Sequence, residues 1–457
     1  VGDGCLAASA DLESCVAAHA SCEQVQTCSA LEPEGCAGEV RFAAVDGSAD
    51  ADGLTMQTPW SLAHAIATAG PGTTVFIQGG DYGDLRLEQS QSGTAEAPIR
   101  FIGTSSNWEL PAVGRRASIT DRDELDPELM PLLSGVLEGN IGQGRAILIQ
   151  GDHVHLANLQ TTRYSTGFEV WSDDVVLENL VSVHHGDFAG AGGFADYNGW
   201  GITVRGDRAQ GRRLYVRDAG AQGISIYGVD GVYEGLEVVG TDTANDMDYY
   251  LLLNGSSNVA RDVRIDRSVG LSHLGHGICM KPIGGETHDN LVDGFEVFNT
   301  NVELQFGGCH DNVVRNGVVT RTDSNPEWGT AVTIANGAHH NLFENIISSR
   351  GYAGVVFNDW DDGAGDEEDG DLADAGHDND FVNLVVRDAA TGIFFRDQGS
   401  DGTASSNRFI HASFVGTDQL FRVRRPNAST RFYNCLVHDA GNFTIDQLGF
   451  TLDAATT

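Results

Sequence analysis

The chain has 457 residues, with 27 lysines and arginines against 65 aspartates and glutamates, which gives a formal net charge of -38 at pH 7. A chain this acidic repels nucleic acid and anionic membrane surfaces, so neither is expected as a partner. Its 58 glycines and 10 prolines predict many tight turns between short elements, which favours an all-β fold.

The N-terminal segment, residues 1–38, is dense in cysteine. Five of the eight cysteines lie there: Cys5, Cys15, Cys22, Cys28 and Cys36. This density predicts a small disulfide-linked segment in an oxidising compartment, and the absence of a CxxC pair argues against a metal knuckle. Because five is odd, one of them pairs with a later cysteine or stays free. We expect an exported, extracellular or cell-surface protein, since no apolar run approaches the ~20 residues of a membrane span and Val1 opens no signal peptide.

Residues 58–70 predict a short helix. Thr58 suits the N-cap, Pro59 the first helical position and Gly70 the end of the helix. The predicted apolar face consists of Trp60, Leu62, Ala63 and Ile66. We expect this helix to cap the open end of the repeats that follow it.

From residue 146 onward the chain repeats a short strand pattern with a period of roughly 22 to 38 residues, the range of solenoids. Apolar and variable residues alternate in nearly every repeat, as a half-buried strand requires. The strand cores are AILIQG (146–151), GFEVWS (167–172), GITVRG (201–206), GISIYG (223–228), YLLLNG (250–255), GICMKP (277–282), NVELQF (301–306), TAVTIANG (330–337), GVVFND (354–359), GIFFRD (392–397) and LFRVRR (420–425).

An asparagine precedes a second strand in the later repeats. These asparagines are Asn258, Asn290, Asn312, Asn341, Asn379 and Asn407. Asparagines stacked at a turn bond to one another and to the backbone along the coil axis. Together the two signals predict a right-handed parallel β-helix of about 11 to 13 coils over residues 39–457.

The region after the predicted helix, GPGTTVFIQGGDYGDLRLEQSQSGTAEAPIRF (70–101), resembles the opening of secreted β-helix polysaccharide lyases of the chondroitinase B, alginate lyase and pectate lyase type. With the later repeats, the resemblance covers most of residues 40–440. It implies a lyase that cleaves an anionic, uronic-acid-containing polysaccharide by β-elimination. Hydrolases, epimerases and adhesins share this scaffold. We expect a monomer.

Aligning the strand cores predicts a column of outward side chains, because equivalent positions on successive coils stack about 4.8 Å apart. With Ile278 and Met280 taken as inward, the column reads Gln150, Trp171, Arg205, Tyr227, Asn254, Lys281, Gln305, Ala335, Asn358, Arg396 and Arg424. None of these residues is acidic. A strip of aromatic, amide and cationic groups is typical of a groove for an anionic sugar, and its alternative is a solvated polar face.

Lys281, in GHGICMKPIGG (275–285), is the only lysine of the chain and stands in the middle of this column. A lyase acting on a uronic acid neutralises the carboxylate, removes the adjacent proton and protonates the departing oxygen. The resemblance implies that Lys281 is the base, a role that lysines fill where burial or nearby cations favour the neutral amine. The candidate proton donors are His276, Tyr249 and Tyr250. The predicted substrate-binding residues are Trp171, Arg205, Tyr227, Asn254, Glu303, Gln305 and Arg396.

Two features depart from the family pattern. Chondroitinase B-like enzymes place an Arg-His pair one coil after the lysine, where this chain has Gln305 and Phe306. The stretch before the lysine carries histidines in place of acidic calcium ligands. Neutralisation of the substrate carboxylate then falls to the amides of the column, to Arg205 or to a calcium ion held elsewhere. The candidate metal ligands are Asp246, Asp248 and His273.

The stretch from NDMDYYLLLNG (245–255) to GHG (275–277) also resembles polygalacturonase-type hydrolases, in which an aspartate pair precedes a strand and Gly-His-Gly opens the next. Here Asp248 takes the first carboxylate position and Tyr249 stands at the second. A glycoside hydrolase centred on Asp248 and His276 is therefore the first alternative. A non-catalytic carbohydrate-binding or surface protein is the second.

Overall fold

The computed structural model describes residues 38–112, 114, 117, 125–186, 198–241, 247–268, 275–322, 329–359, 375–396, 404–424, 427–428 and 430–445. The five N-terminal cysteines lie outside these residues, so the disulfide-linked segment stays a prediction. The chain divides into two compact units, Val1–Ala191 with Asn198–Ala219, and Gly192–Tyr197 with Gly220–Thr457.

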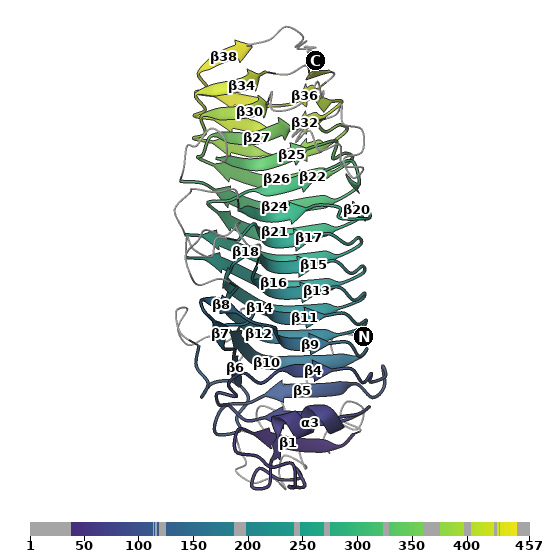
Figure 1. The fold of residues 1–457 in the computed structure, drawn as a ribbon. Helices are drawn as coiled ribbons and strands as arrows, with labels where there is room; N and C mark the ends of the chain where they lie inside the picture. Colours follow the sequence, from purple (N-terminus) through teal and green to yellow (C-terminus); the bar gives the residue numbers. More distant parts are fainter. Residues whose placement is uncertain are drawn as a thin grey trace. The chain divides into compact units, whose positions relative to one another are not determined.

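In the first unit, from residue 145 onward, each turn of the chain adds one strand to each of two parallel sheets (Figure 1). One sheet contains β1 (Val40–Ala44), β3 (Thr74–Ile77), β5 (Ile99–Gly103), β10 (Val154–Thr162), β12 (Val176–His185) and β14 (Gln210–Ala219). The other contains β4 (Leu87–Gln89), β9 (Arg145–Ile149), β11 (Thr166–Val170) and β13 (Trp200–Val204). The short strands are β2 (Trp60–Ser61), β6 (Leu132–Ser134) and the antiparallel pair β7 (Leu137–Glu138) and β8 (Ile141–Gly142).

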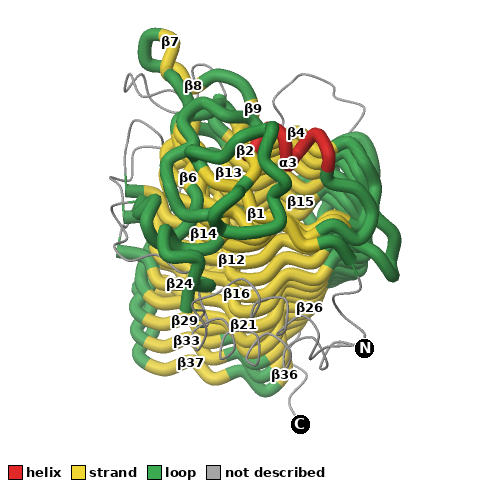
Figure 2. The backbone as a smooth tube through the Cα atoms, turned by 90° about the horizontal axis from the view of Figure 1, so that it is seen from below, coloured by secondary structure: helices red, strands yellow, loops and turns green. Residues whose placement is uncertain are grey.

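Helix α3 (Leu62–Thr68) is the only helix in the described part of the chain. Its N-cap is Ser61, whose hydroxyl accepts a hydrogen bond from the main-chain N–H of His64. The predicted start at Thr58 is wrong, because the residues directly before the helix form β2. The helix packs against β1, β2 and β4 (Figure 2), and its role as a cap stays a prediction. Its buried face consists of Leu62, Ala65 and Ile66.

The second unit repeats the same arrangement of parallel coils (Figure 1). One sheet contains β15 (Gln222–Ile226), β17 (Tyr249–Leu253), β19 (His276–Met280), β22 (Val302–Gln305), β25 (Thr330–Ala335), β27 (Ala353–Asn358), β30 (Thr391–Phe395), β34 (Gln419–Val423) and β38 (Asn442–Ile445). These strands, with β9, β11 and β13 of the first unit, confirm every strand core predicted from the sequence.

A second sheet of this unit begins with β16 (Val232–Gly240), β18 (Val259–Arg267), β21 (Leu291–Phe298), β24 (Val313–Thr320) and β26 (Leu342–Ser349). Each later coil contributes two shorter strands, and Figure 2 shows β29, β33 and β37 following one another at its edge. The two successive strands of each coil are β28 (Asp380–Val382) and β29 (Val385–Arg387), then β32 (Arg408–Ile410) and β33 (Ser413–Val415), then β36 (Arg431–Tyr433) and β37 (Leu436–His438). The turns carry β20 (Thr287–His288), β23 (Cys309–His310), β31 (Ala404–Ser405) and β35 (Asn427–Ala428).

The core of the second unit consists of columns of like side chains. Phe343, Phe381 and Phe409 stack at centroid distances of 4.9 and 4.6 Å with interplanar angles of 8° and 7°. Identical residues at one position on successive coils stack because the coils keep a common spacing. Fully buried aliphatic side chains lie beneath the sheet that β15, β17 and β19 begin: Ile224, Leu251, Ile278, Val302, Val332, Val355 and Ile393.

The predicted asparagine ladder is confirmed. Oδ1 of Asn312 accepts hydrogen bonds from the main-chain N and the Nδ2 of Asn290, at 3.0 and 2.9 Å. The same pair of bonds joins Asn312 to Asn341, Asn341 to Asn379, and Asn379 to Asn407. These amides are almost fully buried, so each bond satisfies a polar group that water does not reach.

Two further observations concern membranes and thiols. Within the described residues, no helix is both long and apolar enough to cross a membrane. Among the cysteines that the structure describes, Cys279 and Cys309 are free and buried, and Cys435 is free and partly buried. Burial raises the pKa of the Cys279 thiol well above its usual value, which makes it a poor nucleophile.

Candidate active site

Tyr249 and His276 occupy the same position on two adjacent coils of the second unit. Tyr249 opens β17 and His276 opens β19, and the two residues pair in register. Because adjacent strands lie about 4.8 Å apart, the two rings stack. Their centroids are 5.0 Å apart and their planes meet at 18°. The imidazole therefore lies directly against one face of the phenol.

Two carboxylates approach the His276 ring. Its Nδ1 donates a hydrogen bond to Glu303, a residue of β22 that is 1% exposed, and its Nε2 lies 3.9 Å from Oδ1 of Asp248. Burial lowers the pKa of His276, but the charge and hydrogen bond of Glu303, with a smaller contribution from Asp248, outweigh this and raise it. The environment therefore favours the imidazolium form.

Lys281 follows β19 directly and contacts the same tyrosine. Its Nζ donates a hydrogen bond to the Tyr249 hydroxyl at 3.1 Å. The ammonium also lies 5.7 Å from the ring centroid of Tyr249 and 5.1 Å from that of Phe306, distances at which an aromatic face attracts a cation. Tyr249 is thus held between Lys281 at its hydroxyl and His276 at its ring. A positive charge on either group stabilises negative charge that develops on the phenol oxygen.

The predicted column around Lys281 is in register within the second unit. The last inward residues of β15, β17, β19 and β22 pair with one another, which aligns the residues that follow them: Tyr227, Asn254, Lys281 and Gln305. The Asn254 amide donates to the carbonyl of Lys281 at 2.7 Å, and Gln305 is 2% exposed. Asn254 therefore supports the backbone beside Lys281, and contact of either amide with substrate stays a prediction.

Trp171 and Arg205 of the same predicted column lie in the first unit. Trp171 follows β11, Arg205 follows β13, and the guanidinium carbon lies 4.9 Å from the centroid of the indole ring. Nε of Arg205 is 3.6 Å from a carboxylate oxygen of Glu169, which also pairs with Arg145. The indole is 51% exposed. An exposed aromatic ring backed by a cation is a surface on which a sugar ring can stack.

Four other predicted residues stand apart from Lys281 or outside the described residues. Tyr250 is fully buried, and a Cβ added at Gly240 would lie 2.2 Å from its hydroxyl, so this tyrosine packs inside the coil and is excluded as a proton donor to a polymer. Arg396 follows β30, several coils further along the column. Asp246 and His273 lie outside the described residues.

Sequence reasoning missed the roles of Glu303 and Phe306. The sequence predicts that Glu303 binds substrate, yet its buried carboxylate bonds to His276 and accepts a hydrogen bond from the Asn301 amide at 3.0 Å. Phe306, which departs from the Arg-His pattern, places its ring beside the Lys281 ammonium. The alignment of β19 with β22 carried this signal, because it sets Glu303 opposite Cys279, in the strand that His276 opens and Lys281 follows.

No protein-family model and no curated protein matches the chain. Solved structures do match. An alginate lyase, AlyF-OU02 in complex with G6, is 12% identical, covers 86% of this chain and 87% of its own, and superposes with a TM-score of 0.51. A PL6 family polysaccharide lyase from Pseudopedobacter saltans is 12% identical and covers 85% of this chain and 95% of its own, with a TM-score of 0.48.

The A-module of a mannuronan C-5 epimerase from Azotobacter vinelandii is 13% identical, covers 82% of this chain and 92% of its own, and has a TM-score of 0.48. This chain has the parallel β-helix fold. That conclusion agrees with the parallel, in-register sheets of both units. The similarity concerns the fold, which hosts more than one kind of chemistry.

Proposed function

We propose that the protein is a polysaccharide lyase that cleaves a uronic-acid-containing chain by β-elimination, with Lys281 as the base. The observation that carries this proposal is the hydrogen bond from Nζ of Lys281 to the Tyr249 hydroxyl at 3.1 Å. This bond places an amine that can accept a proton next to a hydroxyl that can donate one. The similar fold of a protein described as an alginate lyase supports a polyuronate as the substrate class.

β-Elimination moves one proton to the enzyme and another from it. Lys281, as the neutral amine, takes the proton from the carbon next to the carboxylate. The C–H electrons form a C=C bond as the bond to the glycosidic oxygen breaks, and the Tyr249 hydroxyl protonates that oxygen. The phenolate left behind faces the Lys281 ammonium and the His276 imidazolium, which stabilise it. Lys281 then returns its proton to Tyr249 through their hydrogen bond, which restores both groups.

The substrate carboxylate needs a neutralising partner before the adjacent proton becomes acidic. We assign this contact to the Asn254 side chain beside Lys281. Calcium, the expected alternative, prefers six to eight oxygen ligands. Near Lys281 the described carboxylates, Asp248 and Glu303, both face His276, so they do not form a calcium cage and no step is assigned to the ion.

The hydrolase alternative fits the same residues less well. Inverting hydrolysis needs two carboxyl groups that flank the scissile bond with room for a water molecule. Here the His276 ring lies against both Asp248 and Glu303, and Glu303 is buried. Both carboxylates therefore interact with His276 and are not arranged as an acid–base pair on either side of a scissile bond. The binding-protein alternative is supported by the Trp171–Arg205 pair, and the assay below separates it from an enzyme.

The substrate class also bears on where the protein acts. Polymeric uronates occur outside cells, so we infer that the enzyme is exported. The cysteine-dense segment agrees with an oxidising compartment. A monomer suffices, because the cluster around Tyr249 is built from one chain.

Two substitutions at Lys281 test the mechanism. Lys281→Ala removes the amine, whereas Lys281→Arg keeps a cation that donates hydrogen bonds but stays protonated. If Lys281 is the base, both variants lose roughly 100-fold or more in kcat. The measurement is the ultraviolet absorbance of the unsaturated uronate product on alginate, pectate and chondroitin substrates, with a reducing-sugar assay in parallel. Tyr433→Phe, an exposed residue of β36 in the other sheet of the unit, is the control and is expected to keep its activity within a few-fold.

The outcomes separate the alternatives. Full activity in Lys281→Arg with loss in Lys281→Ala would assign Lys281 an electrostatic role and overturn its role as base. Reducing ends without ultraviolet absorbance would identify a hydrolase. Binding of polymer without either product would identify a carbohydrate-binding protein.

A further inference from the structure

A three-residue pattern recurs at one turn of the second unit, immediately before the ladder strands. It reads SSN (256–258), HDN (288–290), HDN (310–312), HHN (339–341), HDN (377–379) and SSN (405–407). The third residue is the ladder asparagine. The middle residue has a left-handed backbone in every copy, with φ between 51° and 59°. The turns therefore superpose, and side chains at one position lie above one another.

The first position of the pattern forms a stack of four imidazoles. The ring centroids of His288 and His310 are 5.2 Å apart, those of His310 and His339 are 5.1 Å apart, and those of His339 and His377 are 4.7 Å apart. All three pairs are nearly parallel, with interplanar angles of 5°, 3° and 13°. In the HDN copies, Nδ1 of each histidine bonds to the aspartate that follows it, at 2.8 or 2.9 Å.

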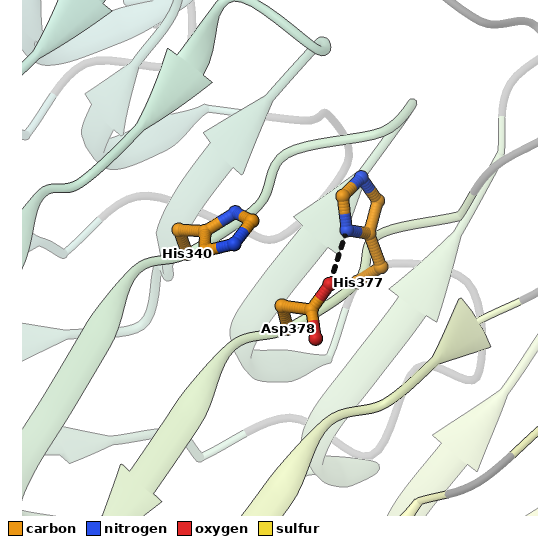
Figure 3. A group of neighbouring side chains, drawn as sticks. All are labelled: His340, His377 and Asp378. Carbon is orange, nitrogen blue, oxygen red and sulfur yellow. Dashed lines mark hydrogen bonds and ion pairs between the residues drawn. The ribbon is translucent and has the colours of Figure 1, made fainter.

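The HHN copy breaks this rule. His340 replaces the aspartate, and its Nδ1 lies 2.7 Å from Nδ1 of His339. Its ring also meets the His377 ring edge-on, at a centroid distance of 5.8 Å and an angle of 85°. Figure 3 shows His340 facing the His377–Asp378 pair of the next turn. One potential ligand atom from each of these three residues lies within 4.8 Å of the others.

We propose that His340, His377 and Asp378 form a binding site for a divalent transition-metal ion of the Zn²⁺ class. Two imidazoles and one carboxylate form a ligand set that suits Zn²⁺ and related ions, whereas Ca²⁺ and Mg²⁺ prefer oxygen alone. Ligands about 2.1 Å from a tetrahedral ion lie roughly 3.4 Å apart. A closing movement on the order of 1 Å by these partly exposed side chains therefore completes the site.

The surroundings of the site support metal binding in two ways. Nδ1 of His377 and a carboxylate oxygen of Asp378 already lie 2.9 Å apart, close to the separation of two ligands of one ion. A net charge of -38 also raises the local concentration of cations.

The site would join two successive turns of the coil. His340 precedes β26 and His377 precedes β28, and the two strands are neighbours in the sheet. A bound ion would tie these turns together and stabilise the folded state, because it binds the native arrangement of the ligands and not the unfolded chain. The site is independent of the cluster around Tyr249.

Isothermal titration of the full chain with Zn²⁺ tests the site. The critical variant is His340→Asn, because asparagine suits the left-handed backbone at this position and carries neither an imidazole nor a carboxylate. His377→Gln removes a second ligand. The control is His310→Gln, which alters the same stack outside the proposed ligand set. We expect at least a roughly tenfold loss of affinity in the first two variants and little change in the control.

A second measurement distinguishes this site from zinc bound by cysteine. Co²⁺ in place of Zn²⁺ gives an intense near-ultraviolet charge-transfer band when a thiolate is a ligand, and an imidazole–carboxylate site lacks it. We expect only weak visible bands, and these disappear in His340→Asn. Equal Zn²⁺ affinity in wild type and His340→Asn, or an equal loss in His310→Gln, would overturn the proposal and leave a structural histidine stack.

Discussion

Glu303 determines the charge of His276, the buried histidine of the candidate active site. Burial alone disfavours a charged imidazole. The Glu303 carboxylate, hydrogen-bonded to Nδ1 of His276, reverses that tendency and raises the pKa of the ring. A cation then lies against the face of Tyr249, opposite to what an apolar pocket would produce. One residue with 1% exposure therefore governs the electrostatics that Tyr249 experiences.

Replacing Glu303 with glutamine should lower the pKa of His276 and destabilise the protein most at acidic pH. A histidine whose folded-state pKa is raised contributes stability that is fully present below its unfolded-state pKa of about 6.5 and is lost as pH rises through the folded-state value. We expect Glu303→Gln to lower the free energy of unfolding by about 2 kcal/mol near pH 6, and by less at higher pH. Urea unfolding over a pH series measures the difference.

Asp248→Asn is the matched control for this variant. Asp248 lies 3.9 Å from the other ring nitrogen, further than the Glu303 carboxylate lies from Nδ1. Its loss should therefore change the pH dependence less than the loss of Glu303. If the difference in unfolding free energy between Glu303→Gln and wild type stayed constant or grew with pH, Glu303 would not be the residue that raises the pKa of His276.

The coil elements are held together by columns that run from strand to strand. In the second unit one column is aromatic, with Phe381 stacked between Phe343 and Phe409. Phe432 extends this column at 5.1 Å from Phe409, but it is only partly buried. The contribution of a ring depends on how many faces it buries, so position in the column determines the effect of its removal.

Phe381→Ala should destabilise the protein by about 3 to 5 kcal/mol, because it leaves a cavity between two stacked rings. Phe432→Ala, at the partly exposed end of the same column, should lose about 1 to 2 kcal/mol. Thermal and urea unfolding of the two variants measure both values. Equal losses of unfolding free energy would show that the contribution of a ring does not depend on its position in the column.

At the scale of the whole molecule, the charge of -38 opposes the proposed substrate. An anionic polymer approaching an acidic protein meets long-range repulsion, and a local cation such as Arg205 acts only at short range. The Debye length falls from about 30 Å at 0.01 M salt to about 8 Å at 0.15 M. Salt should therefore help this enzyme find its substrate, the reverse of what is usual for a basic protein on a polyanion.

We expect kcat/KM on a polyuronate to rise by roughly twofold to tenfold between low and physiological ionic strength. The measurement is the initial rate of product absorbance at substrate concentrations below KM. A methyl-esterified polyuronate, whose carboxyl groups are neutral, should show little salt dependence. A rate on the charged polymer that falls with salt would argue against an anionic substrate bound in the expected way.

Much of the fold could be predicted because it depends on local and repeated features. The alternation in GICMKP (277–282) and the other strand cores, and the regular asparagines such as Asn312, follow from side-chain direction and turn chemistry. The helix start could not be placed, because Thr58 and Ser61 are both good N-caps and pairing of β2 with β1 decided between them. The HHN exception at His340 is visible in the sequence, although its meaning depends on which turns stack.

The strand pattern along the chain is enough to predict parallel coils and to place a lone lysine among the outward-facing residues. The partners of that lysine follow only from the way the coils stack. Contact between Lys281 and Tyr249, and between His276 and Glu303, joins residues of different coils, so it depends on the register of the stack and on side-chain burial. Alternation shows which face a residue occupies, but the pairing of strands across coils selects its partner.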